Sequence, residues 1–356
     1  MSTETLKQFH RLPQSTYIDA LRFLPPLSAF DRYVVIASFN SDTDETSIGI
    51  HALNPTDAPT LTLQSSFPTS SRISSLKVAQ KSLQNPLIAA STFAGSLHIL
   101  FPNPIDASFE SEVSIPEKTL HLGPISCLDL QENGSACVSV GEDGRVNLIS
   151  VGDSGLDYRR VFDSKGLVSY TAARWASPTE FATGGLGNSL QWWDQRRPGG
   201  PVSQFKGNWA EGASSGVVHS IDIHPSRKHT CLAGGSYGTV FAWDLRRQQQ
   251  PIILSGIGTS DTTSNICISS SDVWEVQYDT FMSSSSRASA NISSDRVLPV
   301  MMCSEDGILA VVKQGEEPTE ILAENCAINS FDIDPQNPSD VICSLEWESV
   351  AILTRA

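Results

Sequence analysis

The sequence predicts an all-β protein, a single seven-bladed β-propeller that takes in residues 1–356. The composition is the first observation, because only 18% of the residues are charged while 24 are glycine and 20 are proline. Such a chain favours many short strands joined by turns. The second observation is a hairpin pattern that recurs at nearly blade-sized intervals. The third is a strand-like segment at each end, which allows the two ends to pair and close a ring.

Six segments repeat the same order of residue types: an apolar strand, a tight polar or glycine turn, and a second strand with alternating apolar residues. They begin at 88, 137, 181, 231, 300 and 341, so successive starts lie 49, 44, 50, 69 and 41 residues apart. A four-stranded propeller blade has a period of about 40–45 residues. A seventh hairpin, 33–39 with 47–53, opens the chain around the acidic loop NSDTDET. Seven hairpins therefore predict seven blades.

Every hairpin is preceded by a short apolar strand, and the first six are followed by a more polar one. The preceding strands are expected at 18–25, 73–79, 125–131, 170–176, 219–225, 273–279 and 328–334, and the following ones include 201–207 and 251–257. The chain ends with the seventh hairpin, so the last blade lacks an outer strand. We expect residues 6–12 to supply that strand, because an open propeller leaves sheet edges that promote aggregation.

A serine-rich segment at about 280–295 accounts for the long interval of 69 residues before the hairpin at 300. Small polar residues between strands are typical of an inserted loop. The composition supports the hypothesis that this loop is phosphorylated or binds a partner.

Charge and cysteine content exclude several classes of protein. Acidic residues outnumber basic ones by 39 to 24, a net charge of −15, and phosphate backbones repel such a surface. We therefore expect no direct nucleic-acid binding. No run of 18 apolar residues occurs, which predicts no membrane insertion. The seven cysteines include no CxxC pair, so they indicate a reducing compartment and not a disulfide framework.

Two patterns look like catalytic or metal sites without the context that such sites need. Ser236 lies in GGSYG, which matches the GxSxG of hydrolases, but a strand follows it where a nucleophile elbow requires a helix. His219, His224 and His229 have no neighbouring cysteine or carboxylate that completes a ligand set. The sequence therefore predicts no enzyme and no cofactor.

The repeats resemble the WD40 repeat family over nearly the whole chain. Two hairpins end in Trp-Asp, two contain an Asp-Gly turn, and HLGPISCLDL at 121–130 resembles a histidine-led repeat entrance. The motif residues are Trp193, Asp194, Trp243, Asp244, Asp143, Gly144, Asp306 and Gly307. We expect the tryptophans to pack between neighbouring blades and the aspartates to end their strands. Trp192 alternates to the opposite side of its strand, where it either packs on the next blade or lies on the surface.

Arginine follows Trp-Asp at the same spacing in two adjacent repeats, at Arg196 and Arg246. The pattern resembles the motif by which WD40 substrate receptors dock on the adaptor of cullin ubiquitin ligases. The alternative is that both arginines are solvated strand ends. Trp209 and Trp347 are further candidates for partner contacts, because aromatic residues in loops often anchor interfaces, although each can equally pack under its own loop.

The order of the degenerate repeats is similar to that of WD-repeat nucleoporins from the Y-shaped, outer-ring subcomplex of the nuclear pore. The similarity lies in VSVGEDGRVNL at 138–148, SLQWWDQRR at 189–197, TVFAWDLRR at 239–247, VWEVQYD at 273–279, CSEDG at 303–307 and the final AILTRA. It implies a non-catalytic scaffold at the nuclear envelope that supports nucleocytoplasmic transport. Its partners would be other Y-complex nucleoporins, with one copy of this chain in a hetero-oligomer.

Overall fold

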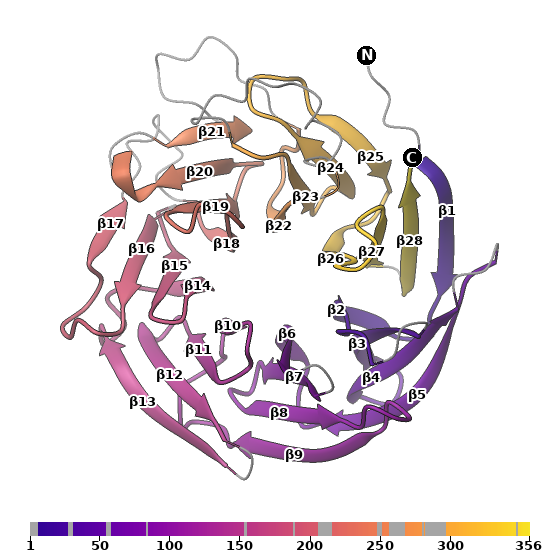
Figure 1. Ribbon diagram of the computed structural model, residues 1–356, viewed down its shortest axis with the longest axis horizontal. Coiled ribbons are helices and arrows are strands. Elements are labelled where there is room, and N and C mark those ends of the chain that lie inside the picture. Colours follow the sequence, from indigo (N-terminus) through magenta and orange to yellow (C-terminus); the bar gives the residue numbers. More distant parts are fainter. Residues whose placement is uncertain are drawn as a thin grey trace.

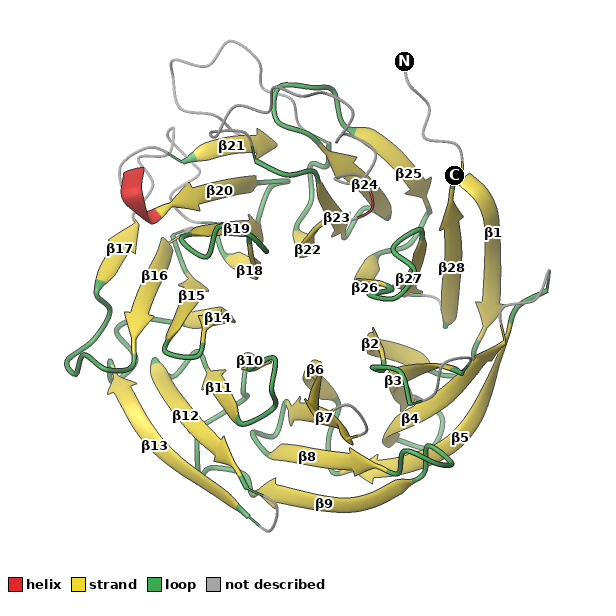
Figure 2. Ribbon diagram, in the orientation of Figure 1, coloured by secondary structure: helices red, strands yellow, loops and turns green. Residues whose placement is uncertain are grey.

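The fold is a ring of seven blades around a central channel (Figure 1). The computed structural model describes residues 6–27, 31–54, 58–82, 85–152, 155–187, 189–205, 216–247, 251–255, 268–279, 281, 297–346 and 348–356. Within these ranges the chain forms seven four-stranded antiparallel sheets. Figure 2 shows that the regular secondary structure of the described part is almost entirely strand. The predicted all-β, seven-bladed propeller is confirmed.

We name the strands of each blade A to D from the channel outward. Blade 1 is β2 (Tyr17–Phe23), β3 (Arg32–Asn40), β4 (Glu45–Asn54) and β5 (Thr60–Thr69). Blade 2 is β6 (Ile73–Ser82), β7 (Asn85–Thr92), β8 (Leu97–Pro102) and β9 (Phe109–Ile115). Blade 3 is β10 (Cys127–Leu130), β11 (Ala136–Val140), β12 (Arg145–Val151) and β13 (Leu156–Asp163). Blade 4 is β14 (Tyr170–Ser177), β15 (Glu180–Gly185), β16 (Ser189–Asp194) and β17 (Ser203–Phe205).

The remaining blades follow the same order. Blade 5 is β18 (Val218–Ile223), β19 (Thr230–Gly235), β20 (Val240–Asp244) and β21 (Ile252–Ser255), with a 3₁₀ turn, η2 (Leu245–Arg247), after β20. Blade 6 is β22 (Val273–Tyr278), β23 (Val300–Ser304), β24 (Ile308–Val312) and β25 (Thr319–Ala323). Blade 7 is β26 (Ile328–Ile333), β27 (Asp340–Leu345) and β28 (Ser349–Arg355), completed by β1 (Leu6–Pro13).

The N-terminal strand closes the ring, as the sequence predicted. β1 pairs antiparallel with β28, from Gln8 opposite Thr354 to Pro13 opposite Ser349, so the two ends of the chain meet in blade 7 (Figure 1). An ion pair of 2.8 Å between Arg11 Nη2 and Glu324 Oε2 also joins β1 to the connection that leads into blade 7. Closure leaves no blade without its outer strand.

Two predicted segments differ in detail from the structure. The first hairpin extends into the acidic loop, so that β3 ends at Asn40, β4 begins at Glu45 and the turn comprises only residues 41–44. Thr46 stays in the sheet because its hydroxyl donates a 2.7 Å hydrogen bond to the carbonyl of Thr69 in β5. The outer strand expected at 251–257 is β21, and residues 256–267 lie outside the described part. The serine-rich segment, apart from Phe281, also lies outside it.

The core consists of apolar layers between neighbouring blades, and Trp192 and Trp193 occupy two different layers. Trp193 packs toward blade 3, stacked on Phe181 with ring centroids 5.7 Å apart, and its Nε1 donates to Thr183 Oγ1 at 2.9 Å. Trp192, on the other side of β16, packs in the layer between blades 4 and 5, together with Trp243. Both sides of β16 are therefore buried, which resolves the two alternatives for Trp192 in favour of packing.

One face of the ring is formed by the B–C turns and by the connections that lead into the A strands. Backbone hydrogen bonds join these two kinds of segment, as from Phe93 N to Arg72 O at 3.0 Å and from Ser236 N to Val217 O at 2.9 Å. We call this side the upper face. The A–B and C–D turns form the opposite, lower face, because the strands of each blade are antiparallel.

Candidate interaction surfaces

The central channel contains a cavity of about 680 Å³. Its walls are built from A strands, which contribute Arg22, Lys77 and Glu275, and from upper-face turns, which contribute Phe93 and Leu186. Charged groups therefore line the inside of the channel, while apolar side chains lie at its upper end. Neither feature follows from the WD40 motifs.

Each A strand places one polar residue at the same position in its blade, paired with the B strand. These residues, which we call the channel ring, are Arg22, Lys77, Asp129, Arg174, Asp222, Gln277 and Asp332. Positive and negative side chains are present in equal number, so their charges largely balance across the channel. Sequence reasoning missed this ring, although its signal is visible as one polar residue between two apolar ones near the end of every A strand.

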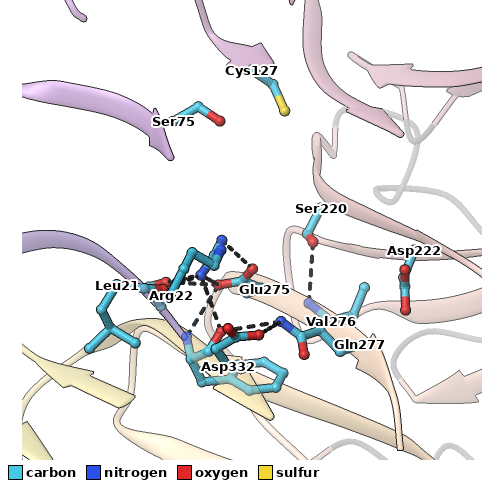
Figure 3. A network of polar contacts seen from close by, with 12 residues as sticks. Leu21, Arg22, Ser75, Cys127, Ser220, Asp222, Glu275, Val276, Gln277 and Asp332 are labelled. Carbon is cyan, nitrogen blue, oxygen red and sulfur yellow. Dashed lines mark hydrogen bonds and ion pairs between the residues drawn. The ribbon is translucent and has the colours of Figure 1, made fainter. Parts of the chain in front are cut away.

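A buried ion pair connects blade 1 with blade 6 across the A strand of blade 7 (Figure 3). Arg22 Nη2 lies 2.6 Å from Glu275 Oε1, and Arg22 Nη1 lies 3.2 Å from Glu275 Oε2. Between them, Ser330 Oγ accepts from Arg22 Nη1 at 2.7 Å and donates to Glu275 Oε2 at 2.9 Å. The side chains of Arg22 and Glu275 are 11% and 9% exposed. The cluster therefore fixes three blades at the seam where the ring closes.

Each of the three aspartates in the channel ring connects its own blade to the next one. The carboxylates of Asp129, Asp222 and Asp332 accept hydrogen bonds from the backbone N–H groups of the next A strand. The donors are Trp175, Tyr278 and Phe23, respectively, each at 2.8 Å. Burial raises the pKa of Asp332 to about 6, against the opposing effect of Arg22. Arg174 adds a second link, at 3.1 Å from Asp129 and 3.2 Å from Asp222. These contacts hold the blades at fixed spacing.

The two Trp-Asp-x-Arg motifs form the same local structure at the C–D turns of blades 4 and 5, on the lower face. Arg196 donates to both carboxylate oxygens of Asp194, at 2.8 and 2.9 Å. Arg246 does the same with Asp244, at 3.0 and 2.6 Å. Each arginine side chain is 64% exposed. The arginines are thus both solvated and ion-paired within their own motifs.

The Asp-Gly motifs form B–C turns on the upper face. Asp143 accepts the backbone N–H of Leu122 at 2.8 Å and the His121 Nδ1–H at 2.9 Å. Gly307 follows Asp306 with φ of 85°, and a Cβ at this position would lie 2.1 Å from the carbonyl oxygen of Glu324. The turn therefore requires glycine. Trp209 and Trp347, the two aromatic candidates, lie outside the described residues.

Ser236 has a histidine and an aspartate nearby, but the three do not form a catalytic relay. Ser236 Oγ lies 3.4 Å from His219 Nε2, and the same nitrogen lies 3.0 Å from Asp272 Oδ2. A Ser-His-Asp triad needs the two partners on opposite ring nitrogens, so that one accepts the serine proton while the other is held by the carboxylate. Ser236 Oγ also accepts the backbone N–H of Val217 at 3.1 Å. The geometry supports a hydrogen-bonded turn.

His224 is a buried, neutral histidine in the A–B turn of blade 5. Its Nδ1 accepts the backbone N–H groups of Ser226 at 3.2 Å and Arg227 at 3.1 Å. Its ring packs against Tyr278 with centroids 5.0 Å apart. Burial and then the Arg227 charge lower the pKa of His224 to about 4. Within the described residues, no three His, Cys, Asp or Glu side chains form a group that can hold a metal ion.

We expect His224 to make the fold sensitive to acid. Its pKa is about 4 in the folded protein and about 6.5 when unfolded, so the unfolded chain binds the proton between these values. The stability from neutral His224 is therefore fully present above pH 6.5 and is lost as the pH falls toward 4. His224→Gln should lose less stability between pH 7 and pH 5 than the natural chain, measured by urea unfolding at both values. His229→Gln, at an exposed position of the same turn, is the control, and equal losses in both variants would contradict the assignment.

The six described cysteines, at 127, 137, 231, 303, 326 and 343, are free thiols. Burial raises the pKa of the Cys231 thiol to about 12 and also raises the pKa of Cys137, Cys303 and Cys343. These thiols pack as small apolar groups in the blade layers. None of the described helical segments has the length and apolar character needed to span a bilayer.

Comparison with known proteins gives a match over nearly the full length. No protein-family model matches the chain. The nuclear pore complex protein NUP43 of Arabidopsis thaliana is 54% identical to it over 360 residues, which cover 98% of both proteins. Nucleoporin Nup43 is 26% identical over 178 residues both in Mus musculus and in Homo sapiens, covering 48% of this chain and 45% of the relative. The chain therefore belongs to the NUP43 family of nuclear pore complex proteins.

Proposed function

We propose that this chain is a non-catalytic scaffold subunit of the nuclear pore complex, joined at the nuclear envelope to other nucleoporins of the Y-shaped subcomplex. The observation that carries the proposal is the 54% identity with a nuclear pore complex protein over 98% of both chains. Such coverage includes all seven blades. We further infer that residues 1–356 act as one propeller domain, present as one copy in a hetero-oligomer.

The structure of the blades supports a scaffold role. Contacts within the channel ring connect successive blades, and the Arg22–Glu275 pair reaches across blade 7. A ring held in this way presents a preorganised surface, so little conformational entropy is lost when partners bind. The shared ring nitrogen in the Ser236 cluster supports the absence of hydrolase chemistry.

Charge supports proteins over nucleic acid as the direct partners. A net charge of −15 repels phosphate backbones. It also lowers the rate at which this subunit would associate with any nucleic acid. The subunit therefore assists transport by holding other proteins in place, and it needs no cofactor for this role.

Affinity purification from the protein's own cells, followed by mass spectrometry, tests this function. We expect the tagged natural chain and the Arg196→Ala, Arg246→Ala double variant to recover the same nucleoporins in equal amounts, within about twofold, because each arginine is ion-paired with its own aspartate at an exposed turn. Both forms should also label the nuclear rim. The chain would instead be a ubiquitin-ligase receptor if the natural form recovers a cullin and its adaptor but no nucleoporins, and the double variant loses the cullin and the adaptor.

A further inference from the structure

The upper face carries a set of exposed apolar side chains on one half of the ring. They come from the B–C turns of blades 2, 4 and 5 and from the connections into blades 3 and 4. Each is at least 50% exposed: Phe93, Leu122, Leu167, Leu186 and Tyr237. We call these five residues the apolar arc. Large apolar side chains that gather on one face, and are not scattered singly, mark interaction sites.

Local contacts bring together three members of the apolar arc, Phe93, Leu122 and Leu186. Phe93 and Leu186 both line the channel cavity. Leu122 is followed by Gly123, and Gly95 lies in the same turn as Phe93. A Cβ added to Gly95 would lie only 2.5 Å from the carbonyl oxygen of Gly123. The two segments are therefore closely packed against each other. Tyr237 is held in the turn of blade 5 by the hydrogen bond from Gly238 N to Ser271 O at 2.7 Å.

Tyr237 provides a second sign of function in this surface. Its backbone has φ of 59°, a left-handed conformation that a bulky aromatic residue rarely adopts. In the equivalent B–C turns of blades 3 and 6 this position holds Asp143 or Asp306, and the glycine that follows, Gly144 or Gly307, corresponds to Gly238, which also has a positive φ. A large aromatic side chain thus stands where the other two turns have a short carboxylate, and this side chain is 50% exposed. Exposed aromatic side chains of this kind are frequent anchors of protein interfaces.

The other half of the upper face is acidic. The B–C turns of blades 6, 7 and 1, together with the first residue of β4, contain seven carboxylates, which we call the acidic arc: Glu305, Asp306, Glu346, Glu348, Asp42, Asp44 and Glu45. None of them forms an ion pair with another described residue. The nearby arginines do not neutralise them, because Arg11 is paired with Glu324 and Arg72 with Asp19. The apolar half carries charges of both signs, because Lys118 and Lys165 lie in its connections while Glu117 and Glu142 are exposed in the connection and the B–C turn of blade 3.

We propose that the upper face is the docking site for a basic amphipathic segment of a partner protein. The apolar side chains of the segment cover the apolar arc, and its lysines and arginines lie beside the acidic arc. Burial of the aromatic and aliphatic anchors supplies the affinity, and the complementary charge fixes orientation and speeds association. This inference rests on the proposed function only in expecting the segment to belong to another nuclear pore subunit.

The charge of this face argues against the other occupants. An anionic lipid surface or a nucleic acid would meet seven carboxylates that form no ion pair within the described part of the chain. A second copy of the chain would bring its own acidic surface, because the net charge is −15. A basic segment is the occupant that neutralises the acidic arc and covers the apolar arc at once.

Site-specific photo-crosslinking in the protein's own cells tests the docking site. Benzoylphenylalanine is placed at Phe93, Leu167 or Tyr237, and at Ile105 as a control. Leu167 and Ile105 are a matched pair, because both are 89% exposed but Ile105 lies in the C–D turn of blade 2 on the lower face. We expect crosslinks from the upper face to exceed those from Ile105 by about tenfold. The captured peptide should contain apolar residues and more Lys and Arg than Asp and Glu.

Charge reversal on the acidic arc provides an independent readout. Asp42→Lys with Glu305→Lys should lower crosslinking from Phe93 by about tenfold. Glu317→Lys with Glu320→Lys, at the lower turn and outer strand of blade 6, is the matched control and should leave the yield unchanged. Urea unfolding midpoints equal to that of the natural chain exclude an effect on folding. Equal loss of crosslinking in both charge variants would count against the acidic arc.

The outcomes separate this inference from the proposed function. The docking site would be overturned, and the scaffold role left intact, if nucleoporins co-purify normally but crosslinks form only from Ile105. The same conclusion would follow if the upper-face positions crosslink to an acidic peptide, a lipid, a nucleic acid or a second copy of the chain. A basic amphipathic peptide from a protein outside the nuclear pore would confirm the docking site and overturn the proposed function.

Discussion

Glu275→Ala is expected to lower the free energy of unfolding by about 3–5 kcal/mol, because it leaves the buried Arg22 guanidinium without its carboxylate. The side chain of Arg22 is 11% exposed. Its two shortest hydrogen bonds to other side chains are those to Glu275, at 2.6 Å, and to Ser330, at 2.7 Å. Ser330 Oγ and Phe331 N also lose their acceptor. Urea unfolding followed by tryptophan fluorescence measures the loss.

The double substitution Arg22→Met, Glu275→Leu separates the charge from the space it occupies. Apolar residues of similar size remove both desolvated charges, so the double variant should be within about 1–2 kcal/mol of the natural chain. Glu320→Ala, at an exposed position on an outer strand of the same blade, should change stability by less than about 0.5 kcal/mol. A single Glu275→Ala variant as stable as this control would show that the seam does not depend on the ion pair.

Most of the fold could be predicted because a propeller is a local repeat. Each blade brings together strands that are neighbours in sequence, so the hairpin spacing and turn residues determine both the strands and their order. The pairing of β1 with β28 joins the two ends of the chain, yet it followed from the missing outer strand of the last blade. Trp192 remained open at the sequence level, because alternation assigns it to one side of β16 without indicating that blade 5 covers that side.

The candidate surfaces depend on contacts that a repeat pattern does not encode. Arg22 and Glu275 are 253 residues apart, and only the closed ring brings them together. The apolar arc combines single side chains from several turns, each of which resembles an isolated exposed residue in the sequence. For Arg196 and Arg246 the sequence left docking and solvation open, and the structure adds the ion pair with Asp194 or Asp244. Long-range geometry, which residue type does not indicate, creates the Arg22–Glu275 pair and the apolar arc.

Deletion of residues 1–13 should open the ring and make the protein associate with itself. The deletion removes β1 and its seven residue pairs with β28, at a cost of roughly 0.5–1.5 kcal/mol for each hydrogen bond lost. It also exposes the backbone of β28, an apolar edge strand in which only Thr354 is not fully buried. Such an edge pairs readily with another chain. We expect a lower urea midpoint and concentration-dependent oligomers in analytical ultracentrifugation, whereas deletion of residues 1–5, which stops before β1, should leave both unchanged. A shortened chain that unfolds at the natural midpoint and sediments like the control would mean that blades 1 to 6 hold the ring without its closing strand.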